Sequence, residues 1–147
     1  MADIINNIVG GRYYILELIG RGGSAIVYKA RDIHNGGIYA LKKYITSDPA
    51  NRKRLLEGME RELEVLKNCT HPVLPKIFDL IKIEDAFFLV MEYIDGIDLK
   101  KYVDEYGTLS TKMLVKVMEQ VCSGFYYLHS LSPAIVYRDL KPANIIL

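Results

Sequence analysis

The chain has 147 residues, of which half are hydrophobic and a quarter are charged, and its formal net charge at pH 7 is +1. A chain of this length and composition can bury the core of one ordinary domain, which excludes a disordered or fibrous protein. The balanced charge provides no overall attraction for nucleic acid or an anionic membrane surface, and we expect no nucleic acid as a partner.

The cysteines and the N-terminus indicate a reducing compartment. Cys69 and Cys122 lie far apart, and residues 1–11 lack the basic start and apolar run of a signal peptide. No apolar stretch approaches the ~20 residues needed to span a bilayer. We therefore expect a cytoplasmic location and no membrane segment in this chain.

The predicted elements begin with three antiparallel strands, at residues 13–20, 25–32 and 37–44. The pair Asn35-Gly36 separates the second strand from the third. Because asparagine and glycine tolerate the positive φ of tight turns, this pair predicts a β-hairpin.

A helix is predicted after the third strand. Ser47-Asp48-Pro49 supplies a capping residue and a proline suited to the first helical position, and His71-Pro72 disfavours continuation at the other end. Between these signals, apolar residues recur at helical spacing at Leu55, Met59, Leu63 and Leu66.

Two more strands are predicted within residues 76–94, joined at Glu84-Asp85, which brings the number of strands to five. A short helix closed by Gly107 follows, and Ser110 begins a long helix that reaches about Ser130. The long helix carries an apolar stripe that should face a partner: Leu114, Val117, Met118, Val121, Cys122, Phe125 and Leu128.

A cluster of glycines, Gly20, Gly22 and Gly23, lies between the first two strands. Glycines let backbone N–H groups approach a phosphate closely, so this turn could cover the phosphates of a nucleotide. The alternative is a mobile glycine hairpin without a ligand.

Lys42 follows the apolar pair Ala40-Leu41 on the third strand, and Glu62 lies on the following helix. A half-buried lysine needs a carboxylate or another anion beside it, so Lys42 and Glu62 could form an ion pair. Two unrelated surface charges are the alternative.

Near the end of the chain, residues 136–147 contain four polar groups at close spacing, Arg138, Asp139, Lys141 and Asn144. Asp139 can accept a proton or hydrogen bond from a hydroxyl, Asn144 can offer a carbonyl oxygen to a hard cation, and Lys141 can neutralise phosphate. These groups are suited to phosphoryl transfer, with a capped polar turn before a strand as the alternative.

Taken in order, the motifs Gly20-x-Gly22…Val27, Ala40-Leu41-Lys42, Glu62, Met91-Glu92-Tyr93 and Tyr137-Arg138-Asp139-Leu140-Lys141-Pro142-x-Asn144 resemble the eukaryotic-type (Hanks-type) serine/threonine protein kinases. The resemblance implies an α+β, protein-kinase-like fold. We expect an N-terminal extension at residues 1–12, an N-lobe and hinge at residues 13–94 with a five-stranded antiparallel sheet and one αC helix, and the start of a mainly helical C-lobe at residues 95–147.

The resemblance also implies the cofactors ATP and magnesium, and a protein substrate with serine or threonine. Asp139 would orient the substrate hydroxyl and take its proton, Lys141 would steady the γ-phosphate, and Asn144 would hold magnesium. Lys42, held by Glu62, would contact the α- and β-phosphates. The implied nucleotide contacts are Ile19, Gly20, Gly22, Gly23, Val27, Ala40, Met91 as gatekeeper, the hinge Glu92, Tyr93 and Ile94, and Asp98 at the ribose.

Three departures from the family pattern matter. Ala25 replaces the usual third glycine and Tyr137 the common histidine, and the glycine turn resembles that of bacterial kinases. The sequence ends before the Asp-Phe-Gly motif, which follows Asn144 within about twenty residues in the family. We therefore expect the amino-terminal part of a kinase domain, inactive or very weak alone, with the stripe of helix 110–130 largely uncovered and prone to association. A non-catalytic nucleotide- or partner-binding module and a poorly folded truncation product remain alternatives.

Overall fold

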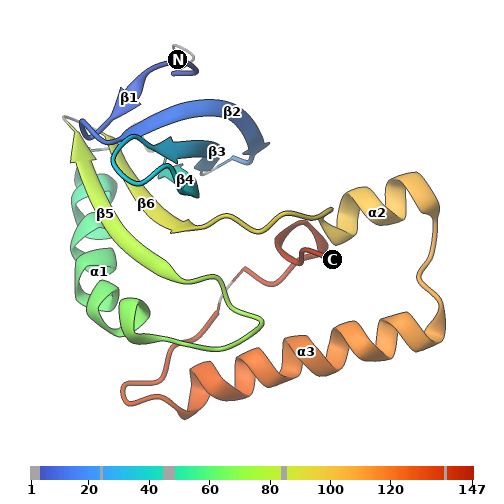
Figure 1. Ribbon diagram of the computed structural model, residues 1–147. Helices are drawn as coiled ribbons and strands as arrows, with labels where there is room; N and C mark the ends of the chain where they lie inside the picture. The colour runs from blue at the N-terminus through green and yellow to red at the C-terminus, as the bar shows by residue number, and fades with distance from the viewer. Residues whose placement is uncertain (1–3, 24, 45–48, 84–85, 138) are drawn as a thin grey trace. The chain divides into compact units, whose positions relative to one another are not determined.

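The computed structural model describes residues 4–23, 25–44, 49–83, 86–137 and 139–147. The described chain forms two compact units. The first contains the chain up to Thr70 together with Pro75–Tyr93, and the second consists of His71–Leu74 and Ile94–Leu147. The first unit is a sheet accompanied by one helix, and the second is mainly helical (Figure 1).

The sheet of the first unit contains six strands rather than the five predicted. The additional strand, β1, has only two residues, too few for an apolar alternation to be recognised. Gly10 and Gly11, with φ of 59° and 65°, turn the chain so that β1 pairs with the next strand. The antiparallel order is β1-β2-β3-β4-β6-β5, with bounds Ile8–Val9, Tyr13–Arg21, Ala25–Asp32, Ile38–Tyr44, Ile77–Ile83 (β5) and Ala86–Glu92 (β6).

The two faces of this sheet have different contents. Leu41 on β4 and Val90 on β6 are cross-strand partners, so their side chains share one face, where both are fully buried. The hydrophobic core lies on that face and comprises Val9, Tyr13, Ile15, Ile26, Tyr28, Ala30, Leu41, Phe88 and Val90. The intervening residues of β3, β4 and β6 therefore form the opposite face, which contains the residues expected to meet a nucleotide.

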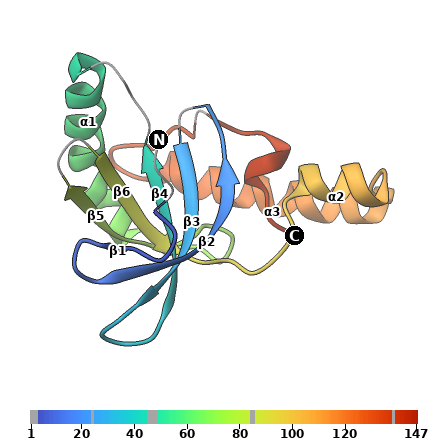
Figure 2. The same ribbon diagram turned by 90° about the horizontal axis from the view of Figure 1, so that it is seen from above.

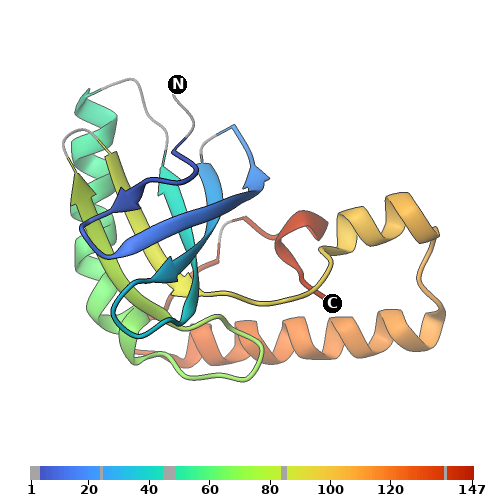
Figure 3. The ribbon, with the colours of Figure 1, turned by 45° about the horizontal axis from the view of Figure 1, so that its top comes forward.

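Helix α1, Pro49–Asn68, runs alongside β5, as Figures 1 and 3 show. Lys67 Nζ lies 3.4 Å from Asp79 Oδ1, and Lys82 forms an ion pair with Glu60, so charges join the helix to the strand at two places. The predicted position of the helix is confirmed. The residues proposed to cap it, Ser47 and Asp48, and the strand junction Glu84-Asp85 lie outside the described residues.

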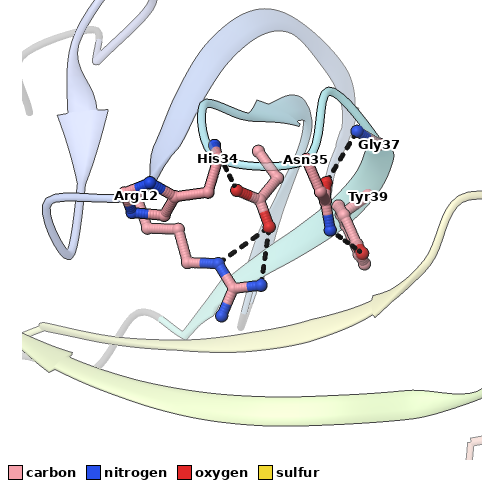
Figure 4. Close-up of polar contacts among 6 residues, drawn as sticks. Arg12, His34, Asn35, Gly37 and Tyr39 are labelled. Carbon is pink, nitrogen blue, oxygen red and sulfur yellow. Dashed lines mark hydrogen bonds and ion pairs between the residues drawn. The ribbon is translucent and has the colours of Figure 1, made fainter.

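The hairpin between β3 and β4 projects from one end of the sheet (Figure 2), and Gly36 in its turn has a φ of 73°, as the Asn35-Gly36 signal predicted. Asp32 before the turn is fully buried. Its Oδ2 accepts a hydrogen bond from Arg12 Nε at 2.7 Å and lies 2.6 Å from Arg12 Nη2 (Figure 4). Its Oδ1 accepts a hydrogen bond from the His34 N–H at 2.9 Å. The Arg12 hydrogen bond is the main reason that the pKa of Asp32 is lowered.

The second unit contains α2, Leu99–Tyr106, α3, Thr111–Ser130, and a 3₁₀ turn, η1, Pro142–Asn144. Ser110 caps α3 as predicted, with its Oγ accepting from the Met113 N–H at 3.3 Å. Gly107 ends α2 with a φ of 83°. Within the described chain, no helix has both the length and the apolar character needed to cross a membrane.

The apolar stripe of α3 is covered at one end only. Leu128 is buried, whereas Leu114 and Met118 are 45% and 44% exposed. Near the covered end, Gly124 lies against Val73 from the short segment that belongs to this unit. The expected stripe is thus largely exposed, with its C-terminal end covered, and association through the exposed part stays a prediction.

Candidate functional site

The glycine turn connects β2 to β3. Gly20 pairs with Val27, and the Gly22 N–H donates to the Ala25 carbonyl at 2.8 Å. Gly20, Gly22 and Gly23 have no positive φ, and a Cβ added at any of them would meet protein atoms only at 3.7 Å or beyond. Among the described residues, neither backbone conformation nor packing requires glycine at these positions, which suits a turn that a ligand approaches closely.

Lys42 lies in a cross-strand row on the face opposite the core. It pairs with Val27 on β3 and with Leu89 on β6, and its Nζ is 5.3 Å from the Tyr44 ring centroid. One row away on the same face, the buried Ala40 pairs with Met91. These contacts bring together the residues of the first unit that were expected at the adenine and the phosphates.

Glu62 lies on α1, but its side chain is outside the described part of the structure. The ion pair between Lys42 and Glu62 therefore remains a prediction.

The predicted hinge begins at the end of β6. The Glu92 N–H donates to the Lys76 carbonyl at 2.8 Å, and Glu92 Oε2 accepts from the Lys76 N–H at 3.1 Å. The ring of Tyr93 lies under the Lys29 ammonium, 4.6 Å from Nζ to the ring centroid. Ile94, which is 39% exposed, begins the second unit.

In the second unit, Asp139, Lys141 and Asn144 form one cluster. Lys141 Nζ donates to both carboxylate oxygens of Asp139 at 2.8 Å. Asn144 Nδ2 donates to the Asp139 carbonyl at 2.7 Å and to Asp139 Oδ2 at 3.0 Å. The spacing in the sequence thus corresponds to direct contact among a carboxylate, a cation and an amide.

Hydrogen bonds hold the backbone within this cluster and after it. The Asn144 N–H donates to the Lys141 carbonyl at 2.9 Å, closing η1. Beyond it, the Ile145 carbonyl accepts from the Leu99 N–H at 2.8 Å, and the Leu147 N–H donates to Ile97 at 2.9 Å. Ile146 forms an isolated β-bridge with Asp98, directly before α2.

Gly96 permits this close pairing. A Cβ at Gly96 would lie 2.5 Å from the Leu147 carbonyl oxygen and 2.6 Å from Ile146 Cγ2. Sequence reasoning missed this residue, because its partner lies about fifty positions further along the chain.

Asp98 has a structural role that was also missed. It caps α2, with Oδ1 accepting from the Lys101 N–H at 2.9 Å and Oδ2 lying 3.2 Å from Lys101 Nζ. Burial pushes its pKa upward, but the hydrogen bonds from Lys101 outweigh burial and leave the pKa lowered. The helical spacing of Leu99, Tyr102 and Val103 after this aspartate was a readable capping signal. The ribose contact expected of Asp98 remains a prediction.

Tyr137, which replaces the common histidine, packs against α3, with its ring centroid 5.7 Å from that of Phe125. Its pKa is raised, first by burial and then by the charge of Asp139. The phenol therefore stays neutral beside the charged cluster.

The oxygen donors of the cluster fit a hard cation. Magnesium commonly takes one or two protein oxygens and completes its shell with water and substrate phosphates. The Asn144 side-chain oxygen is suited to this, and the described residues contain no cluster of three or more His, Cys, Asp or Glu side chains able to hold a metal alone. The Asn144 side-chain oxygen is thus of the type that magnesium accepts from proteins.

Comparisons with known proteins agree with this arrangement. Residues 13–147 match the family model described as "protein kinase domain". The chain is 37% identical over 144 residues to the serine/threonine-protein kinase PrkC of Bacillus subtilis, and 31% identical over 142 residues to the probable serine/threonine-protein kinase PknB of Lactococcus lactis. These alignments cover 98% and 97% of this chain but 22% of each relative, so the chain spans about a fifth of their length.

Among solved structures, Rad53 1-466 in complex with AMP-PNP is similar, with a TM-score of 0.78 and 31% identity over 92% of this chain and 34% of that one. The expected protein-kinase-like α+β fold is confirmed, and so is the resemblance to bacterial kinases. The chain therefore belongs to the protein kinase domain family.

Proposed function

We propose that this chain supplies the ATP-binding and catalytic-loop part of a serine/threonine kinase, which transfers the γ-phosphoryl group of Mg-ATP to a protein hydroxyl. The observation that carries the proposal is the cluster of Asp139, Lys141 and Asn144, in which Lys141 Nζ lies 2.8 Å from both Asp139 oxygens. The AMP-PNP bound to the Rad53 relative supports ATP as the nucleotide.

In the proposed reaction, the substrate oxygen forms a bond to the γ-phosphorus while the bond to the β–γ bridging oxygen breaks, and ADP leaves with that electron pair. Asp139 orients the hydroxyl and accepts its proton. Lys141, already beside this carboxylate, neutralises charge on the γ-phosphate. Asn144 would hold magnesium through its side-chain oxygen, and the ion would supply charge neutralisation at the phosphates.

The residues proposed to bind the nucleotide come from the first unit. Val27 and Ala40 would pack on the adenine, and Lys42 would contact the α- and β-phosphates. Their position on one sheet face, opposite the core, supports a shared ligand. The glycine turn would cover the phosphates, because an added Cβ at Gly20, Gly22 or Gly23 would meet the described atoms only at 3.7 Å or beyond.

The 147 residues by themselves are proposed to bind nucleotide and to transfer phosphate very slowly or not at all. Asn144 is their one side chain implied to bind magnesium, and they contain no Asp-Phe-Gly motif. The cytoplasmic location expected from the sequence stays a prediction.

Binding is tested with the purified chain, Mg²⁺ and a fluorescent ATP analogue. Lys42→Met should abolish measurable binding, because it removes the cation at the phosphates. Lys43→Met is the matched control, since Lys43 lies next in the strand and on the other face, 5.6 Å from the Phe88 ring centroid. Equal binding by both variants would contradict the assignment of Lys42.

Catalysis is tested by replacing the corresponding segment of the PrkC kinase domain with residues 13–147 and measuring transfer from labelled ATP. The chimera should be active, and Asp139→Asn should abolish transfer while nucleotide binding remains. A folded chimera that binds ATP without transfer would favour a non-catalytic nucleotide-binding module. Robust turnover by the 147-residue chain alone, lost on Asp139→Asn, would refute the proposed inactivity.

A further inference from the structure

Lys29 joins two segments of the first unit that lie far apart in the sequence. Its Nζ is 3.3 Å from Glu17 Oε1 on β2 and 4.6 Å from the centroid of the Tyr93 ring, just beyond β6. The Lys29 side chain is 27% exposed, so its ammonium is partly screened from water. One cation therefore contacts both the strand that leads to the glycine turn and the start of the hinge.

Lys29 lies on the face proposed to bind the nucleotide. It is two residues from Val27 on β3, and it pairs with Ala40, which in turn pairs with Met91. Its pKa is raised, chiefly by a hydrogen bond with the Tyr93 side chain and then by one with Glu17. The ammonium thus remains charged at neutral pH, with both partners engaged.

The hinge start is also held from its other side. Glu92 exchanges two hydrogen bonds with the backbone of Lys76, at 2.8 and 3.1 Å. Lys76 thus fixes Glu92 and Lys29 fixes Tyr93, so two consecutive residues have separate anchors. A backbone that distinguishes bases by hydrogen bonds has to be held in position, because the groups of a preorganised site must lie within about 0.5 Å of their productive positions.

We propose that Lys29 is a positioning residue for base recognition, which holds the Glu92–Tyr93 backbone so that adenine nucleotides are preferred over guanine nucleotides. The inference rests on the proposed nucleotide binding by this face. It assigns to Lys29 an effect on selectivity, distinct from the effect of Lys42 on phosphate affinity.

The test measures the affinities of the 147-residue chain for fluorescent ATP and GTP analogues with Mg²⁺. Lys29→Met keeps the length of the side chain and removes the charge. An exposed cation–π contact corresponds to roughly a two- to fivefold change in affinity, so the ratio of ATP to GTP affinity should fall by about that factor. Lys43→Met, which removes a similar contact with Phe88 on the core face, should leave the ratio unchanged.

Tyr93→Leu provides a second route that keeps Lys29 and removes the ring. It should lower the same ratio, and the double variant should lower it no further, because either change removes the same contact. Thermal melts identify any variant that does not fold.

The outcomes separate the two proposals. A wild-type chain that binds neither nucleotide would overturn the proposed function and this inference with it. A wild-type chain that binds ATP, with an unchanged ratio in a folded Lys29→Met or Tyr93→Leu variant, would overturn the inference alone. An equal fall in both affinities would likewise reduce Lys29 to a general structural role.

Discussion

Replacing Gly96 by alanine tests the packing beside the catalytic loop most directly. The new methyl group would lie 2.5 Å from the Leu147 carbonyl oxygen, whereas real Cβ contacts essentially never fall below 3.0 Å. The backbone at residues 145–147 would have to move away by about 0.5 Å, which equals the tolerance of a preorganised site. The hydrogen bonds of Ile145 and Leu147 to the segment before α2 would be stretched.

The expected cost in stability follows from this overlap. Overpacking in a close-packed region typically costs about 1–3 kcal/mol, and here the obstacle is backbone rather than a flexible side chain. We expect Gly96→Ala to lower the free energy of unfolding by an amount in this range. Because Asn144 lies next to the displaced segment, the chimeric kinase should also lose activity, by roughly tenfold or more.

Urea unfolding followed by circular dichroism measures the stability change. Gly58→Ala is a matched control, because Gly58 lies within α1 and the added Cβ would have no heavy atom of another described residue outside its own turn of helix within 4 Å. Alanine is favoured over glycine in a helix by about 1 kcal/mol, so the control should be more stable than the wild type. If Gly96→Ala proved as stable as the wild type, the close approach of Leu147 to Gly96 would be refuted.

Three further predictions concern the fold. Because the pKa of Asp32 is lowered in the folded chain, its carboxylate stabilises the fold above the unfolded pKa of about 3.9, and this stabilisation is lost as the pH falls through the folded pKa. The urea midpoint of Asp32→Asn should thus lie below that of the wild type at pH 7 and approach it at pH 3. Leu41→Ala, at a fully buried site, should lower the free energy of unfolding by about 2–5 kcal/mol, measured with urea. Ile38→Ala, at the exposed end of the same strand, should lower it by about 1 kcal/mol or less. Ser110→Ala removes the α3 cap and should cost about 1 kcal/mol, with a loss of helical signal on warming.

Much of the fold was predictable because its signals are local. The Asn35-Gly36 turn, the Ser110 cap and the stop at Gly107 each depend on a few consecutive residues, and each was confirmed. Strand β1 was missed because a two-residue strand depends on pairing with β2 rather than on its own pattern.

In the candidate site too, contacts between neighbours in the sequence were predictable, and contacts between distant segments were not. Asp139, Lys141 and Asn144 lie within six residues, so their spacing alone predicted the cluster. The contact between Lys29 and Tyr93 and the buried pair of Arg12 with Asp32 depend on sheet register and long loops, which no local pattern specifies. The pairing of Lys42 with Glu62 remains a prediction.

The division of β4 between two faces has a consequence for how this sequence can vary. Inserting or deleting one residue in the strand would turn Leu41 away from the hydrophobic core and place the Lys42 side chain on the core face. Such a shift of the strand register would destabilise the fold itself, whatever its effect on phosphate binding. Selection for a stable fold would therefore preserve the register of β4, and with it the position of residue 42 on the face opposite the core.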